Sequence, residues 1–387
     1  SCVAAPACAA RSMLAGSAGD HLEFRAPVAL SQLSEAPVYQ AADRRRELDL
    51  LTERLRLAVQ PEEVEEAASL LLTLAAEAHR LSDQDINRIL ELVQILFTTR
   101  AEVGANSRAA MTLAALAERG EVGGEVLLRI VAICELALPS AGSLVAAELF
   151  EVLGKVVGRH EASPEVVGKV VTIAGCQQLA AHHADAPGAH IAALSTLASA
   201  INGTGMDAAL LHAIVEAAEM IMTIDRADAV AETALVTVAV AAGSHQAEAL
   251  VLQRVITFCE SVWERTFRGA DGSKLPDFLL RVLGMVAQCD AVDSGTLLRI
   301  AAVAAEAKDG MPVLVEVVRS RSVTKDLLRR VIESTSAALQ RRPHSQDRFS
   351  FEVLASAARH PITDAELLNY ITHIVEMAVQ DPTRPDS

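Results

Sequence analysis

The sequence is poor in aromatic residues. Phe, Trp and Tyr make up 3% of the 387 residues, although hydrophobic residues as a whole make up 51%. Sheets favour aromatic and β-branched side chains, whereas Ala is the strongest helix former and small side chains let helices approach closely. The composition therefore argues against a sheet protein and favours an all-helical protein with many helix–helix contacts.

Basic residues are also in short supply. The chain has 34 Lys and Arg against 50 Asp and Glu, which gives a net charge of −16 at pH 7. A protein that binds nucleic acid usually carries a basic domain with clustered Lys and Arg. Any contact with nucleic acid would here need a local set of bases, while the overall charge suits basic partners.

Paired cysteines and long hydrophobic runs are missing as well. None of the six cysteines has CxxC spacing, and Cys134, Cys176, Cys259 and Cys289 lie in apolar stretches. We expect these four to be free thiols packed as small hydrophobic side chains, which fits a reducing compartment. The longest apolar run, near residues 234–243, is about half of the roughly 20 residues that a membrane helix needs. The sequence therefore predicts no transmembrane segment.

A short phrase recurs along the chain: an apolar residue, any residue, Arg or Lys, then another apolar residue. Six copies carry the base and two lack it, and the starts are about 40 residues apart except for one step of 31 residues. Such self-similarity is the mark of a stacked repeat protein. Copies with the base start at Ile86, Leu127, Val167, Leu252, Leu297 and Leu328, and copies without it start at Leu211 and Leu368.

The apolar spacing within each repeat is that of two helices. We expect an all-α, right-handed solenoid of about eight helical hairpins over residues 46–380, between an irregular N-terminal extension, 1–45, and a tail, 381–387. Ser163 before Pro164, and Thr363 three residues before Glu366, fit helix starts. The expected helix pairs are 62–79 with 84–98, 105–119 with 125–138, 143–159 with 164–180, 187–201 with 206–223, 227–242 with 246–266, 275–288 with 293–308, 311–320 with 323–340, and 347–359 with 363–379.

The bases of the phrase are the best candidates for a binding site. In a repeat stack, equivalent positions line up, so these side chains could meet RNA phosphates or a partner's carboxylates. The alternative is that each base pairs with acids of its own or the adjacent helix, such as Glu91 for the first base and Glu333 for the last. The six residues, which we call the basic series, are Arg88, Arg129, Lys169, Arg254, Arg299 and Arg330.

Other candidate sites are weak. His182, His183 and His190 lack the further ligands of a tetrahedral metal site, so we expect them in a polar insertion loop. The Gly-rich segment 269–274 lacks the order of a phosphate-binding loop and is expected to be a surface loop. No nucleophile–base or paired-carboxylate set stands out. We therefore predict no enzyme, no metal and no cofactor.

The repeat units resemble a known class. An Ala/Leu helix, a Gly turn and the phrase itself follow one another over residues 107–138, and the design returns in residues 190–222 and 349–378. This design resembles the heptatricopeptide-type helical repeats of organellar proteins, which are similar to pentatricopeptide and octotricopeptide arrays. The resemblance covers about residues 62–380. A C-terminal RAP-type domain is not recognisable, and the acidity departs from the pattern.

The resemblance implies a role with organellar RNA. Many such proteins are similar to structural proteins of protist mitochondrial ribosomes, so the first expectation is a non-catalytic ribosomal component that contacts ribosomal RNA and ribosomal proteins. The alternatives are an accessory scaffold subunit of a respiratory or ATP-synthase complex and a HEAT-like protein-binding adaptor. Residues 1–19 contain Arg11, many Ala and Ser and no acid, which is typical of a transit-peptide remnant. We therefore expect a mitochondrial location.

Overall fold

The computed structural model describes residues 41–57, 60–76, 81–98, 102–119, 122–203, 206–267, 275–307, 309–341 and 347–379. All regular elements in these ranges are helices, and none of the described residues forms a strand. The all-helical repeat fold predicted from the sequence is therefore confirmed. The chain divides into two compact units, and the division in the sequence falls between Thr233 and Ala234. Each unit is described by itself.

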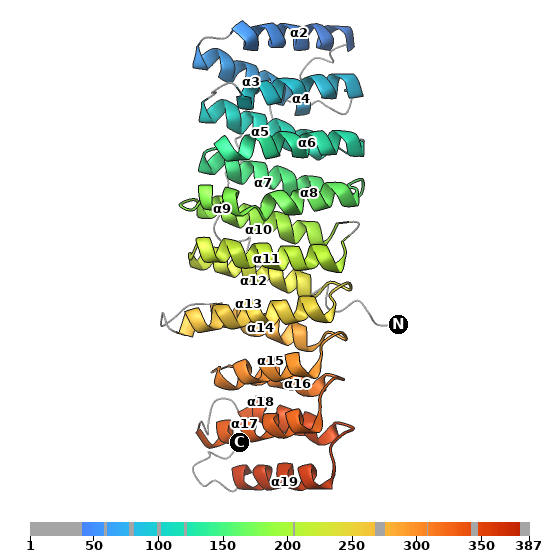
Figure 1. Cartoon of the computed structure of the whole chain (residues 1–387), viewed down its shortest axis with the longest axis vertical. Coiled ribbons are helices and arrows are strands. Elements are labelled where there is room, and N and C mark those ends of the chain that lie inside the picture. Colours follow the sequence, from blue (N-terminus) through green and yellow to red (C-terminus); the bar gives the residue numbers. More distant parts are fainter. Residues whose placement is uncertain are drawn as a thin grey trace. The chain divides into compact units, whose positions relative to one another are not determined.

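Among the described residues, the N-terminal unit shows one helix followed by stacked hairpins (Figure 1). The expected extension, 1–45, lies outside the described residues as far as residue 40, and the first described helix begins at Ala41. The helices are α2 (Ala41–Leu57), α3 (Pro61–Ala76), α4 (Asp83–Thr98), α5 (Val103–Ala117), α6 (Gly124–Ala137), the short η3 (Leu138–Ser140), α7 (Ser143–Val157), α8 (Pro164–Ala174), α9 (Gln177–His182), α10 (Pro187–Ile201) and α11 (Ala208–Ile224).

The C-terminal unit continues the same design. Helix α12 (Asp228–Ala242) carries the boundary between the units. The step of 31 residues between two copies of the phrase falls here, and α16 has only nine residues, as the spacing predicts. The expected tail, 381–387, lies outside the described residues. The remaining helices are α13 (Ala249–Phe267), α14 (Leu275–Ala287), α15 (Ser294–Glu306), α16 (Met311–Arg319), α17 (Lys325–Arg341), α18 (Asp347–Arg359) and α19 (Ala365–Val379).

The two helices of a hairpin pack differently on their neighbours. In the N-terminal unit the first helices α3, α5, α7 and α10 contact one another more extensively than the second helices do. Small side chains permit this close approach: Ala109, Ala146 and Ala193 are almost fully buried between these helices. The more widely spaced second helices carry the repeated phrase, and their longer polar side chains span the gaps between successive hairpins.

The apolar residues of the phrase form the core of each repeat. In α15, Leu297 and Ile300 are fully buried, and in α6 the same holds for Leu127 and Ile130. Burial of this kind stabilises a fold by about 25 cal/mol per Å² of apolar surface. The basic residue between these two apolar residues is half-buried and lies at the edge of the buried helix face.

One predicted helix is broken. Residues 164–180 were expected to form a single helix, but α8 ends at Ala174 and α9 begins at Gln177. The break lies where Gly175 approaches α11: a Cβ atom on Gly175 would lie 2.9 Å from the Cβ of Ala217. Only a residue without a side chain fits this crossing.

A predicted helix start is shifted by one residue. Ser163 caps α8 as expected, since its hydroxyl accepts from the Val166 amide. At α19, however, the cap is Asp364, whose carboxylate accepts from the Leu367 amide at 3.0 Å. Thr363 instead donates to the Ala357 carbonyl. The capping box expected between Thr363 and Glu366 is therefore wrong.

Candidate functional site: the basic series

Each residue of the basic series lies in the second helix of a hairpin. Arg88 is on α4, Arg129 on α6 and Lys169 on α8, all in the N-terminal unit. The other three, Arg254 on α13, Arg299 on α15 and Arg330 on α17, lie in the C-terminal unit. All but Arg330 are half-buried, because the apolar residues on both sides draw the aliphatic part of the side chain against the stack.

In the N-terminal unit the three bases contact residues of the preceding helix in the stack. Arg88 lies 3.0 Å from Glu91 on its own helix and 3.7 Å from Asp49 on α2. Arg129 donates to the side-chain oxygen of Asn87 on α4. The Lys169 ammonium lies 3.1 Å from Glu135 on α6. Each base thus ties its hairpin to the one before.

In the C-terminal unit the best-formed contact is that of Arg299. Its guanidinium makes a two-pronged pair with Glu260 on α13, with 2.8 Å between Nε and Oε1, and also donates to Thr257. The hydrogen bond to Glu260 raises the pKa of Arg299. A bidentate pair of this geometry is the strongest form of Arg–carboxylate contact.

The other two bases of the C-terminal unit differ from each other. Arg254 is half-buried and has an interaction partner as well. Arg330 is exposed and makes no hydrogen bond or ion pair within the described part of the chain. Its neighbours Lys325 and Arg329 pair instead with Asp364 and Glu366 of the next hairpin.

The repeat register explains why Arg330 stands apart. Glu135 and Glu260 occupy the same place, eight residues after the start of the phrase in their own helix. The residue at that place in α15, ahead of Arg330, is Ala305. Because the preceding hairpin has no carboxylate at that place, Arg330 has no acid opposite to it and remains exposed. The expected pair of Arg88 with Glu91 is confirmed, whereas Arg330 does not pair with Glu333.

The energetic weight of these contacts is modest one by one. The Lys169 side chain is 39% exposed and that of Arg299 36% exposed. Pairs at such exposure contribute about 0.2–1 kcal/mol each. Their repetition joins one hairpin to the next at the same place, which fixes the register of stacking.

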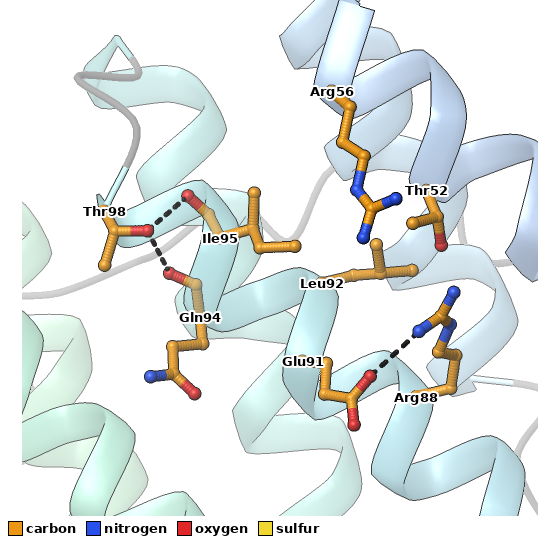
Figure 2. A pocket seen from close by; sticks show the side chains of 8 residues that line it. All are labelled: Thr52, Arg56, Arg88, Glu91, Leu92, Gln94, Ile95 and Thr98. Carbon is orange, nitrogen blue, oxygen red and sulfur yellow. Dashed lines mark hydrogen bonds and ion pairs between the residues drawn. The ribbon is translucent and has the colours of Figure 1, made fainter.

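A shallow hollow lies beside the first of these contacts. It has a volume of about 290 Å³, and residues of α2 and α4 line it. Figure 2 shows Arg56 and Arg88 reaching toward it from the two helices, with Arg88 bonded to Glu91. Both guanidinium groups are balanced by nearby carboxylates, since Arg56 also lies 3.6 Å from Glu53 and Arg88 lies 3.7 Å from Asp49.

The histidines hold the insertion between α8 and α10 in place. His183 and His190 are buried, so the polar loop expected for them is wrong. His190 donates from Nε2 to the Ala180 carbonyl at 3.0 Å, and its Nδ1 lies 2.9 Å from the Asp225 carboxylate. Burial lowers the pKa of His183, whose Nε2 lies 3.3 Å from the Leu138 carbonyl. These bonds satisfy polar groups that burial would otherwise leave unpaired.

No group of three metal-ligating side chains occurs among the residues that the structure describes. The thiols of Cys134 and Cys259 are free and buried, and burial raises the pKa of both. Cys176 and Cys289 are also free but only half-buried. Burial raises the pKa of Cys289 to about 11, so its thiol stays protonated and unreactive at neutral pH.

Sequence reasoning identified the bases and the partner of Arg88 on its own helix, Glu91, but missed the partners on neighbouring helices. The spacing of eight residues between the phrase and Glu135 or Glu260 was readable from the sequence, because the acid recurs at the same place in two repeats. Asp225 carried no such signal: it lies outside the phrase, and only the fold brings it against His190. None of the described helices has the length and apolar character needed to cross a membrane.

Comparisons with known proteins add a general likeness only. No protein-family model matches the sequence, and the search of curated proteins found no match. An engineered protein of known structure is 18% identical and aligns with a TM-score of 0.43 over 62% of this chain and 98% of its own. A second engineered protein is 14% identical, with a TM-score of 0.35 over 87% of this chain and 95% of its own. A circular tandem repeat protein is 18% identical, with a TM-score of 0.21 over 88% of this chain and 75% of its own.

Proposed function

We propose that this protein is a non-catalytic scaffold that holds other macromolecules together in a larger assembly. A stack of helical hairpins offers a long surface for contact. The proposal rests on the contacts that residues of the basic series make with neighbouring repeats. Four of its six members bond to the preceding helix of the stack, as Lys169 does to Glu135 and Arg299 to Glu260, so these charges serve the architecture of the stack.

The assembly that the sequence resemblance favours is a mitochondrial ribosome. In this narrower proposal the protein contacts basic ribosomal proteins through its acidic surface, in keeping with a net charge of −16. Contacts with ribosomal RNA are few and involve phosphates. They come from bases that no repeat contact uses, above all Arg330.

The test is the sedimentation of the endogenous protein in extracts of isolated mitochondria. We expect it to sediment with ribosomal particles and to stay with them at raised salt, since contacts beyond phosphate pairing resist salt. Sedimentation as a free protein would overturn the scaffold proposal. Sedimentation with a detergent-extracted respiratory or ATP-synthase complex would keep the scaffold and reject the ribosome.

The RNA contact has a test of its own. Replacement of Arg330 by Glu is expected to reduce ultraviolet crosslinking to RNA, because the change removes an exposed cation without breaking a repeat contact. The matched control is Glu333→Gln on the same exposed helix surface, which should leave crosslinking unchanged. Equal crosslinking in all three proteins, each with unaltered circular dichroism, would confine the partners to proteins.

A further inference from the structure

A row of apolar side chains crosses the second helices of the N-terminal unit. Each member lies nine residues after the start of the phrase, or of its copy without the base. Leu136 on α6 is 51% exposed, and the other three are half-buried. Because α4 packs on α6, α6 on α8 and α8 on α11, equivalent positions of these helices line up. We call these four residues the lateral row: Ile95, Leu136, Cys176 and Met220.

The lateral row does not result from the position of a chain end. Helices α6 and α8 pack on described second helices on both sides, so the next repeat is already in place where Leu136 is exposed. The C-terminal unit has Ser261, Glu306 and Ala337 at the same place of α13, α15 and α17, and an apolar residue larger than Ala returns only on α19. The repeat design therefore does not require an apolar residue here. A continuous exposed apolar surface marks a contact site.

The helices that carry the lateral row are acidic. Helices α4, α6, α8 and α11 contain eight Asp and Glu against three Lys and Arg. All three bases already bond to residues of their own or the preceding helix. Glu125 and Glu165, in the first turns of α6 and α8, and Glu216, one turn before Met220, are exposed and form no ion pair within the described residues. The surface thus combines an apolar row with negative charge that the described residues leave unbalanced.

Charge argues against the ends of this chain and against a second copy as the occupant. Residues 1–40 contain two bases, Arg11 and Arg25, against three acids, and residues 380–387 contain one base against two acids. A second copy would bring a net charge of −16. Like charges placed together suppress a pairing. The occupant that this surface fits carries apolar residues together with an excess of Lys and Arg.

We propose that the lateral row is a docking surface for a basic amphipathic helix of another protein. Successive helices of a stack lie about 8–10 Å apart, and seven residues of a helix rise by about 10 Å. A helix laid across the stack therefore meets each member of the row with every seventh residue, which returns to nearly the same face. Its flanking Lys and Arg reach Glu125, Glu165 and Glu216. The inference rests on the scaffold function proposed above and names the surface on which a basic partner binds.

A synthetic peptide tests this surface in the purified full-length protein. The probe is a helix of about 22 residues, built from Ala and Lys with Leu at every seventh position, since this length spans four stacked helices at about 1.5 Å per residue. We expect saturable binding, measured by fluorescence anisotropy. Leu136→Glu should weaken binding about tenfold, because it places a charge in the apolar contact. Glu216→Lys should weaken it by a similar factor, because it repels the lysines of the peptide.

Matched controls separate the lateral row from unspecific attraction. Met111→Glu on α5 changes a side chain that is 45% exposed, and Glu151→Lys on α7 changes an exposed acid of the same unit. Both should leave binding unchanged, and circular dichroism verifies that each variant is folded. A peptide of the same composition with its leucines spread around the helix should bind about tenfold more weakly. Equal binding of the two peptides, equal losses in row and control variants, or no saturable binding up to about 1 mM peptide overturns the proposal.

A photo-reactive phenylalanine analogue in place of Leu136 identifies what covers the row. We expect no crosslink to residues 1–40 or to a second copy in the purified protein, and a crosslink to the peptide once it is added. A crosslink to residues 1–40 or to a second copy would show that the chain covers its own row, and it would overturn the proposal. Sedimentation of the endogenous protein is a separate measurement, so failure of the peptide test and failure of the scaffold function are distinguishable.

Discussion

At the scale of single residues, the role of a repeated basic residue depends on the side chain that faces it from the preceding hairpin. Arg299 and Arg330 occupy the same place in the phrase, yet one forms a bidentate pair with Glu260 and the other is exposed. The difference arises in the preceding hairpin, where Glu260 in one repeat is replaced by Ala305 in the next. The sequence predicts where the bases lie, because their spacing is periodic, and it predicts the pair of Arg88 with Glu91; the fold shows which acids of other helices face Lys169 and Arg299.

The buried contact between His190 and Asp225 gives a second prediction about single residues. His190→Ala should lower the free energy of unfolding by about 3–5 kcal/mol, since it leaves the Asp225 carboxylate buried without its partner. Asp225 is 8% exposed and His190 only 2% exposed. Chemical denaturation monitored by circular dichroism measures the change. His212→Ala, on a more accessible part of α11, is the control and should cost less than about 1 kcal/mol. A similar, small loss in both variants would contradict a stabilising role for the pair.

At the scale of elements, the helix ends could be predicted to within a few residues because the apolar spacing and the turn residues agree. The expected helix 275–288 is α14, Leu275–Ala287, and the expected helix 347–359 is α18, Asp347–Arg359. The break after Ala174 could not be predicted, because it depends on how closely Gly175 approaches Ala217 on α11. A glycine in a helical pattern gives no information about the helix that crosses it.

Two glycines of the C-terminal unit provide a matched test of whether the fold leaves room for a side chain. Gly310 precedes the short helix α16, and a Cβ atom there would overlap the Ala304 carbonyl. Gly310→Ala should therefore destabilise the protein by about 1–3 kcal/mol. Gly284, within α14, has open space around the added carbon, so Gly284→Ala should stabilise it by about 0.5–1 kcal/mol. Thermal unfolding measures whether each variant is less or more stable than the original protein. An unchanged stability of Gly310→Ala would contradict the account and show that the turn rearranges easily.

At the scale of the whole molecule, periodicity made the fold class predictable and left the function open. The phrase, its interval of about 40 residues and the scarcity of aromatics all indicate stacked helical hairpins. The same periodicity is expected whether the basic series binds a ligand or joins the repeats to one another. Only the acids opposite the bases distinguish the two, and within each unit they favour the structural role.

The measurement that bears most directly on the structural role of the basic series is a charge-swap cycle between Arg299 and Glu260. Arg299→Glu and Glu260→Arg should each lower the free energy of unfolding, and the double variant should recover about 0.5–1 kcal/mol of coupling. Glu and Arg have similar helix propensities, so charge is the main change. Arg330→Glu, which breaks no repeat contact, should leave the stability unchanged. Strictly additive losses in the double variant, with no recovery, would contradict the conclusion that these bases join one repeat to the next.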